Sequence, residues 1–250
     1  MHSWVGKKGT PVTLTLFRES KGQWEVTIVR DTIVIPSVEI EVGNWGNEGW
    51  VKDEKGTVAW IKVRRFGDNT QAQWDQAVNQ ITTMMGQLKG IVLDLRNNPG
   101  GYLEGAVSLA SDFIGEGVVV NQQGRLETKT YQVDRRGRLL GMPVVVLING
   151  GSASASEILA GALRDRVQAK LVGERSFGKG TVQEALDLSS KAGLHVTTAK
   201  WLLPNGDWIH EEGLKPDVEV KLAETTSASA SADMVDKQLQ QAITTLEAKP

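Results

Sequence analysis

The chain has 250 residues and a mass of 27.2 kDa, which fits one large domain or two small ones. Its 40% hydrophobic and 23% charged residues are typical of a globular protein, and its net charge of −2 leaves no broad basic surface for nucleic acid or a membrane. The lack of cysteine excludes disulfides, thiolate metal sites and a cysteine nucleophile.

The chain begins with strand patterns. Residues 12–18 and 24–42 alternate between polar and apolar side chains and are rich in Val, Ile and Thr, which predicts strands. Residues 43–56 carry many Gly and Asn and predict a loop or hairpin, and residues 58–63 predict another strand. The short polar start has no apolar leader, so the chain is either cytosolic or a fragment whose targeting segment is missing. A strand with no partner before it favours the fragment.

The rest of the chain alternates between helix patterns and short apolar strands. Apolar residues recur at three- and four-residue steps over residues 70–88, which predicts an amphipathic helix. Further on, the patterns predict strands at 91–95, 118–120, 144–148, 169–172, 181–188 and 194–203, helices at 103–114 and 156–166, and a hairpin or flap at 121–142. This alternation predicts an α/β fold with a largely parallel central sheet. Residues 223–232 resemble a low-complexity linker, and residues 233–247 predict a last helix.

Ligands of α/β sheets bind at the carboxyl ends of the strands, so the loops at residues 96–101, 149–156 and 173–180 form the candidate site. In the first loop, the backbone N–H groups of Gly100 and Gly101 could hold an anion or an oxyanion, or the loop could be a simple turn. The second loop holds three alternating serines at residues 152, 154 and 156. Ser154 and Glu157 also have the spacing of a capping box, so this serine could simply cap the helix.

The third loop is close to a phosphate-binding loop, with Gly173, Gly178 and Lys179 at the required spacing. That motif needs Ser or Thr after the lysine and then a helix, whereas Gly180 follows here and residues 181–188 alternate as a strand. A nucleotide-dependent enzyme is therefore a disfavoured alternative. Lys179 remains as an exposed turn residue or as a catalytic base.

The three histidines do not favour a Ser-His-Asp triad. His2 lies in the N-terminal start, His195 in an alternating strand, and His210 after a turn. No spacing of His, Asp and Glu matches a metal site, and we expect no metal and no cofactor. A serine with a lysine base is the remaining nucleophilic arrangement.

Three motifs then carry a resemblance to a known family, and two later segments fit it as well. The sequence closely resembles the carboxyl-terminal processing (tail-specific) peptidases, a family of Ser/Lys-dyad serine proteases, over about residues 25–222. The matching segments are LDLRNNPGG at 93–101, SASASEILAGAL at 152–163, GERSFGKGTVQ at 173–183, PNG at 204–206 and GLKPD at 213–217.

The resemblance implies a role for each matching residue. It implies that Ser154 is the nucleophile, that Lys179 is the general base and that Gln183 orients the lysine. It also implies that Asp165 supports the two dyad residues without being one of them. The residues alone do not choose Ser154 over the serines at 152 and 156.

The resemblance also implies an oxyanion hole, made by the N–H of Ala155 and that of Gly101 or Gly100. For the lysine to act as a base at neutral pH it must be desolvated, because burial disfavours an ammonium ion. We expect apolar neighbours to supply that dry pocket, namely Leu171, Val172, Phe177 and Val182.

The resemblance further implies a crotonase/ClpP-like spiral core with a small α+β cap. It divides the chain into a remnant of a PDZ domain at 1–20, a serine protease core at 21–222, and a linker with a C-terminal helix at 223–250. The implied function is a serine endopeptidase that acts near protein C-termini through an acyl-enzyme. An inactive polypeptide-binding module on the same fold is the alternative.

The expected partners are protein or peptide substrates with accessible C-termini, without nucleic acid and without stable membrane insertion. The last helix could pack on the core or on a second subunit, so a homo-oligomer stays open. The resemblance implies an extracytoplasmic location, in the periplasm or cell envelope.

Overall fold

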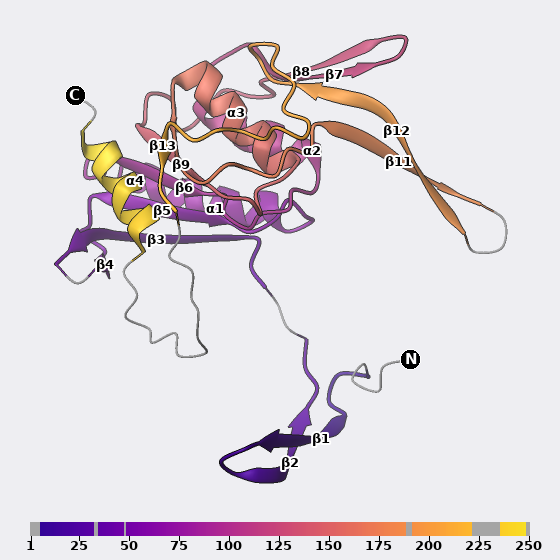
Figure 1. Cartoon of the computed structure of the whole chain (residues 1–250). Helices are drawn as coiled ribbons and strands as arrows, with labels where there is room; N and C mark the ends of the chain where they lie inside the picture. The colour runs from indigo at the N-terminus through magenta and orange to yellow at the C-terminus, as the bar shows by residue number, and fades with distance from the viewer. Residues whose placement is uncertain (1–5, 33–34, 48, 189–191, 222–235, 249–250) are drawn as a thin grey trace. The chain divides into compact units, whose positions relative to one another are not determined.

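The computed structural model describes residues 6–32, 35–47, 49–188, 192–221 and 236–248 (Figure 1). The chain divides into two compact units, Met1–Ile35 and Pro36–Pro250. This division falls later in the chain than the boundary predicted after residue 20.

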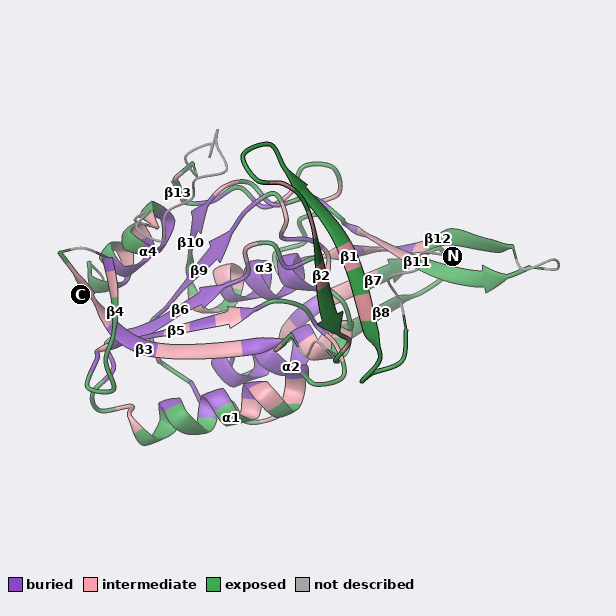
Figure 2. Cartoon of the chain, turned by 90° about the horizontal axis from the view of Figure 1, so that it is seen from below, coloured by how far each residue is buried: buried purple, intermediate pink, exposed green. Residues whose placement is uncertain are grey.

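The first unit is an antiparallel hairpin. Strand β1 (Pro11–Arg18) pairs along its whole length with β2 (Gly22–Val29). Most of its residues are exposed (Figure 2). Phe17, for example, shows 73% of its surface to solvent. The alternating pattern correctly predicted both strands, although the pattern at 24–42 does not form one continuous strand.

The second unit is built on a seven-stranded sheet with the strand order β13-β10-β9-β6-β5-β3-β4. Its strands are β3 (Val38–Gly46), β4 (Gly49–Lys52), β5 (Val58–Val63), β6 (Gly90–Asp94), β9 (Val144–Ile148), β10 (Lys170–Gly173) and β13 (Val218–Glu219). Neighbours from β13 to β5 pair in parallel, and β3 and β4 add antiparallel pairs at one edge. The predicted α/β fold with a largely parallel central sheet is confirmed.

Helices cover both faces of this sheet. Successive side chains of a strand point to opposite faces, so the fully buried central strands place apolar side chains on both. Ile91 and Leu93 of β6 pack into a core with the first three helices, whereas Val92 between them packs with Leu239 and Ile243 of the last helix. The helices are α1 (Thr70–Thr83), α2 (Leu103–Phe113), α3 (Ala155–Val167) and α4 (Lys237–Glu247). None of the helices in the described ranges is long and apolar enough to cross a membrane.

A second sheet of four antiparallel strands has the order β11-β12-β7-β8. Its strands are β7 (Val118–Gly124), β8 (Thr128–Gln132), β11 (Thr181–Asp187) and β12 (Gly193–Leu202). The hairpin of β11 and β12 extends away from the main sheet (Figure 1). Strand β11 begins directly after the third candidate loop, so this sheet is continuous with the candidate site.

The predicted helices lie at the expected places with shifted ends. The predicted helix at 70–88 ends at Thr83, and the last helix begins at Lys237 rather than at residue 233. The predicted linker at 223–232 lies outside the described residues.

Candidate active site

The three candidate loops lie together because they follow three neighbouring strands. Strands β6, β9 and β10 are adjacent and parallel, so their carboxyl ends meet at one edge of the sheet. Backbone hydrogen bonds join the loops directly. The Ala153 N–H donates to the Asn98 carbonyl, and the Phe177 N–H donates to the Ser152 carbonyl, each at 2.9 Å. The predicted convergence of the loops is confirmed.

The three alternating serines differ in their surroundings. Ser152 is fully buried and its hydroxyl donates to the Leu95 carbonyl at 2.8 Å. Ser156 is also fully buried, and its hydroxyl lies 2.9 Å from the Asn98 carbonyl. Ser154, in contrast, is only half-buried. Two of the three hydroxyls are therefore bound within the structure, and Ser154 is the only one of these three serines that is partly exposed.

Ser154 stands at the N-terminus of α3 in an unusual backbone conformation. Its φ of 57° is positive, which non-glycine residues rarely adopt and which is often found at functional sites. Its N–H donates to the Glu157 carboxylate at 2.8 Å, and the predicted capping box of Ser154 and Glu157 is present. The helix N-terminus places a partial positive charge beside this residue.

Gly100 of the first loop faces the same serine, whereas Gly101 lies against the backbone of Phe66. Gly100 has a φ of 95°, and a Cβ atom on it would lie 2.9 Å from the Ser154 Cβ and 3.0 Å from the Ala155 nitrogen. The Gly100 N–H donates to the Asn98 side chain at 2.8 Å, within its own turn. Gly101, with a φ of 135°, is exposed. The structure thus brings the glycine turn against Ser154 and Ala155.

Lys179 and Gln183 line one cleft of about 770 Å³, together with Pro99, Gly151 and Ala153 from the other two loops. A bulge in β11 lies between Val182 and Gln183, and such bulges redirect the side chains beside them. Strand β11 follows the lysine where a phosphate-binding loop would need a helix.

The predicted apolar enclosure of Lys179 is wrong. The lysine is exposed, and Phe177 beside it is 64% exposed. Leu171 and Val172 are buried within the sheet core instead, because β10 is a central strand with both faces covered. Both residues lie within the described part of the chain, and no hydrogen bond joins the Ser154 hydroxyl to the Lys179 ammonium group there.

His210 lines the same cleft as Lys179. Its ring stacks on Trp208 with the centroids 5.2 Å apart, and its Nδ1 is buried without a hydrogen-bond partner among the described residues. No sequence pattern indicated this position, since His210 follows a turn far along the chain from the other candidate residues. His195 is exposed on β12, and His2 lies outside the described residues.

Asp165 lies away from the cleft. It is eleven residues after Ser154 on α3, which corresponds to about 16 Å along a helix. Its carboxylate accepts from the Arg164 side chain at 2.9 Å and from the Asn205 N–H at 3.3 Å. The structure therefore does not bring Asp165 together with the other candidate residues.

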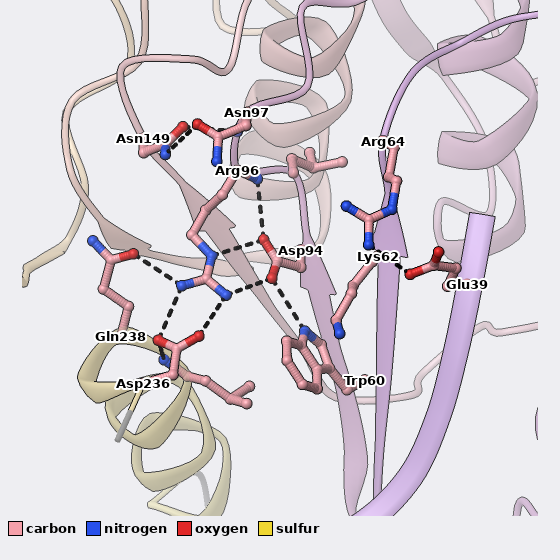
Figure 3. Close-up of polar contacts among 12 residues, drawn as sticks. Glu39, Trp60, Lys62, Arg64, Asp94, Arg96, Asn97, Asn149, Asp236 and Gln238 are labelled. Atoms are coloured by element: carbon pink, nitrogen blue, oxygen red, sulfur yellow. Dashed lines mark hydrogen bonds and ion pairs between the residues drawn. The ribbon is translucent and has the colours of Figure 1, made fainter. Parts of the chain in front are cut away.

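A buried ionic network holds the base of the first loop (Figure 3). The Arg96 guanidinium bonds to Asp94 at 2.6 Å and to Asp236, the N-cap of α4, at 2.8 Å. Gln238 of α4 accepts from the same guanidinium at 3.1 Å, and the Trp60 indole donates to Asp94 at 3.2 Å. The C-terminal helix is thus tied to the residue that precedes the glycine turn.

Charge pairing governs the ionisation of this network. Burial by itself would lower the pKa of Arg96, but its hydrogen bonds to Asp94 and Asp236 raise it overall. Burial would raise the pKa of Asp236, yet the Arg96 guanidinium lowers it below its usual range. Both charges are therefore stabilised as a pair.

The turn is also linked sideways to the serine loop. The Asn97 N–H donates to the Asn149 side-chain oxygen at 2.9 Å, and the two side-chain amides bond to each other at 3.0 Å (Figure 3). The same Asn149 oxygen accepts from the Gly151 N–H at 3.0 Å. A continuous set of bonds therefore runs from α4 to the loop that carries Ser154.

Comparison with known proteins adds a family match. The model of peptidase family S41 matches residues 57–220. A carboxy-terminal-processing protease of Bartonella bacilliformis is 38% identical over 221 residues, which cover 86% of this chain and 48% of that protein. The carboxy-terminal processing protease CtpA of Bacillus subtilis is 37% identical over 218 residues, covering 87% of this chain and 44% of that protein.

A solved structure agrees with these matches. The photosystem II D1 C-terminal processing protease superposes with a TM-score of 0.66 and 31% identity, over 86% of this chain and 57% of that one. The chain spans about half the length of the curated relatives that it matches.

Proposed function

The chain belongs to peptidase family S41, and from this premise we propose that it is a serine endopeptidase that cleaves protein substrates near their C-termini. The observation that carries the proposal is the contrast among the three serines. Ser152 and Ser156 are buried in structural hydrogen bonds, whereas Ser154 is half-buried, has a rare backbone conformation and directly follows Ala153, which lines the cleft together with Lys179. This contrast supports Ser154 as the nucleophile.

In this proposal Lys179 is the general base and Gln183 orients it, and their place in one cleft supports both roles. The lysine is exposed in the chain alone, so a bound peptide must exclude water from it. The exposed side chain of Phe177, which lines the cleft, offers an apolar surface for such a peptide.

The proposed oxyanion hole consists of the N–H groups of Ala155 and Gly101. Of the two glycines, Gly101 is the better donor, because the Gly100 N–H already donates to Asn98. Gly100 instead provides the close approach to Ser154. We assign Asp165 to the support of the C-terminal part of α3, where it pairs with Arg164.

The proposed reaction follows the usual two stages of acyl transfer. The Ser154 Oγ attacks the peptide carbonyl carbon while its proton moves to the neutral Lys179 amine. The oxyanion that forms accepts hydrogen bonds from the N–H groups of Ala155 and Gly101. The C–N bond then breaks, and the lysine gives the proton to the leaving amine. Water attacks the resulting ester with the lysine again as base, and the proton returns to Ser154 as the carboxylic acid leaves.

We further propose that residues 1–20, which lie within the first unit, are a remnant of a PDZ domain, and that the core follows a crotonase/ClpP-like spiral with a small α+β cap. An extracytoplasmic location is also a proposal from the family resemblance. The last helix packs its apolar face on the core, so a homo-oligomer, which stays a proposal, would use another surface. These features bear on how a substrate tail is delivered, whereas the residues of the cleft bear on cleavage itself.

The test is hydrolysis of an unstructured casein, together with labelling of Ser154 by a fluorophosphonate. We expect Ser154→Ala and Lys179→Ala to reduce kcat/KM by about 10⁴-fold or more, and Lys52→Ala, an exposed lysine on β4, to leave it unchanged. Hydrolysis that survives Ser154→Ala would refute the proposal. Binding of casein without hydrolysis by the wild type would instead favour the inactive polypeptide-binding module.

A further inference from the structure

The carboxylate of Glu157 receives hydrogen bonds from both sides of the cleft. Its Oε2 accepts from the Ser154 N–H at 2.8 Å and from the Lys179 N–H at 2.9 Å. Its Oε1 accepts from the Gly178 N–H at 2.7 Å and from the Ser176 hydroxyl at 2.5 Å. One side chain therefore holds the loop after β9 and the loop after β10.

A helix cap alone does not explain this arrangement. For the carboxylate, a cap needs only the bond to the Ser154 N–H. Glu157 is instead fully buried, and burying a carboxylate is unfavourable unless it is fully bonded. The three further donors all come from the lysine loop, and four donors match a group that can only accept.

The bonds extend to a third segment. The Ser176 hydroxyl, which donates to Glu157, also accepts from the Leu214 N–H at 2.6 Å. The preceding residues of that segment, His210 and Glu211, line the cleft. Glu157 is thus the point at which the serine loop, the lysine loop and this segment are joined.

We propose that Glu157 is a positioning residue, which sets the spacing between Ser154 and Lys179 without touching the substrate. The proposal rests on the proposed function, because it assigns these two residues to the reaction. Since a single oxygen accepts the N–H of each, any displacement of that oxygen changes the distance between the two loops.

The direct test is Glu157→Gln, which keeps the shape but replaces one acceptor oxygen by a donor group. We expect kcat to fall by about 100-fold, because a misplacement of about 1 Å has an effect of that size. KM should stay within about twofold, since the residues that line the cleft are unchanged. The matched control is Glu104→Gln, which removes an exposed carboxylate from the first turn of α2 and should leave kcat unchanged.

A second readout does not depend on activity. Amide hydrogen exchange should accelerate at both Ser154 and Lys179 in the Glu157→Gln variant. It should accelerate at neither residue in the Glu104→Gln variant. Acceleration at Ser154 alone, or an unchanged kcat, would show that Glu157 only caps α3 and would overturn the proposal. A wild-type chain that neither hydrolyses casein nor labels would refute the proposed function, while the exchange pattern would still decide the role of Glu157.

If Glu157→Gln fails to fold, the Ser176→Ala variant tests the same role of Glu157. It removes one donor to Glu157 and touches neither Ser154 nor Lys179 directly. We expect kcat to fall by roughly tenfold with KM unchanged. An unchanged kcat in that variant would overturn the proposal.

Discussion

Replacement of Gly100 by alanine tests whether the glycine turn must press against the nucleophile. The new Cβ would lie 2.7 Å from the Ala153 carbonyl oxygen and 2.9 Å from the Ser154 Cβ. Ordinary contacts begin near ~3.5 Å, so the two loops must separate by roughly half an ångström or more. Such a shift moves Ser154 relative to Lys179 and to the proposed oxyanion hole.

The expected loss follows from that displacement. A misplacement of about 1 Å costs on the order of 100-fold in rate, so we expect kcat/KM on casein to fall by about 10- to 100-fold. The positive φ of 95° adds roughly 1–2 kcal/mol of backbone strain, which lowers Tm by about 2–8 °C in a chain of this size. Steady-state hydrolysis and thermal unfolding measure the two effects separately.

Gly206→Ala is the matched control. Gly206 has a φ of 92°, almost the same as Gly100, but a Cβ atom there has no neighbour within 4 Å. The control should therefore lose a similar amount from backbone strain and keep its activity. Equal activity of the Gly100 and Gly206 variants would refute the claim that close approach to Ser154 matters for cleavage.

Two further predictions concern buried carboxylates. Asp112 is fully buried; burial raises its pKa, but bonds from Arg138, Arg135 and Trp74 lower it from 3.8 to about 2. Asp112 therefore contributes about 2 kcal/mol to the free energy of unfolding above pH 3.8, and this contribution is lost as the pH falls toward 2. In urea unfolding, the stability of Asp112→Asn should depend less on acid than that of the wild type. An equal acid dependence of the two proteins would contradict this prediction. Asp236→Asn keeps an N-cap but loses the ion pair with Arg96, so we expect the variant to be about 1–3 kcal/mol less stable than the wild type at neutral pH. This difference in stability should narrow in acid, because the wild type loses the ion pair once the pH falls below the lowered pKa of Asp236. A difference that widens in acid would contradict the prediction.

Much of the fold could be predicted because apolar runs have few solutions. The five apolar residues of β9 are too few for a helix and too apolar for an exposed strand, so a buried parallel strand follows. The rule that ligands bind at the carboxyl ends of such strands then predicted the three loops. The strand pattern at 24–42 was misleading because Pro36 cannot donate to a ladder, and β3 begins only at Val38.

The environment of Lys179 could not be predicted from its apolar neighbours in the sequence. Leu171 and Val172 face the core because of their place in β10, whereas Phe177 lies in the loop that follows this strand and is exposed. The spacing of Ser154 and Glu157 predicted one hydrogen bond of the carboxylate. The other three come from a loop about twenty residues away, and only the folded arrangement reveals them.

The two proposed catalytic groups differ in how far the chain alone prepares them. Ser154 is held by a strained backbone, a buried carboxylate and a glycine at close contact, all of which are in place without substrate. Lys179 has its backbone fixed by the same carboxylate, but its side chain faces solvent. Because a lysine in water is a poor base, cleavage under the proposed mechanism requires a chain that fills the cleft and displaces that water. An extended, unfolded tail can do this, whereas a folded surface loop that cannot enter the cleft leaves the lysine hydrated. Selectivity for protein tails would then follow from desolvation of the base, in addition to any recognition of the tail elsewhere.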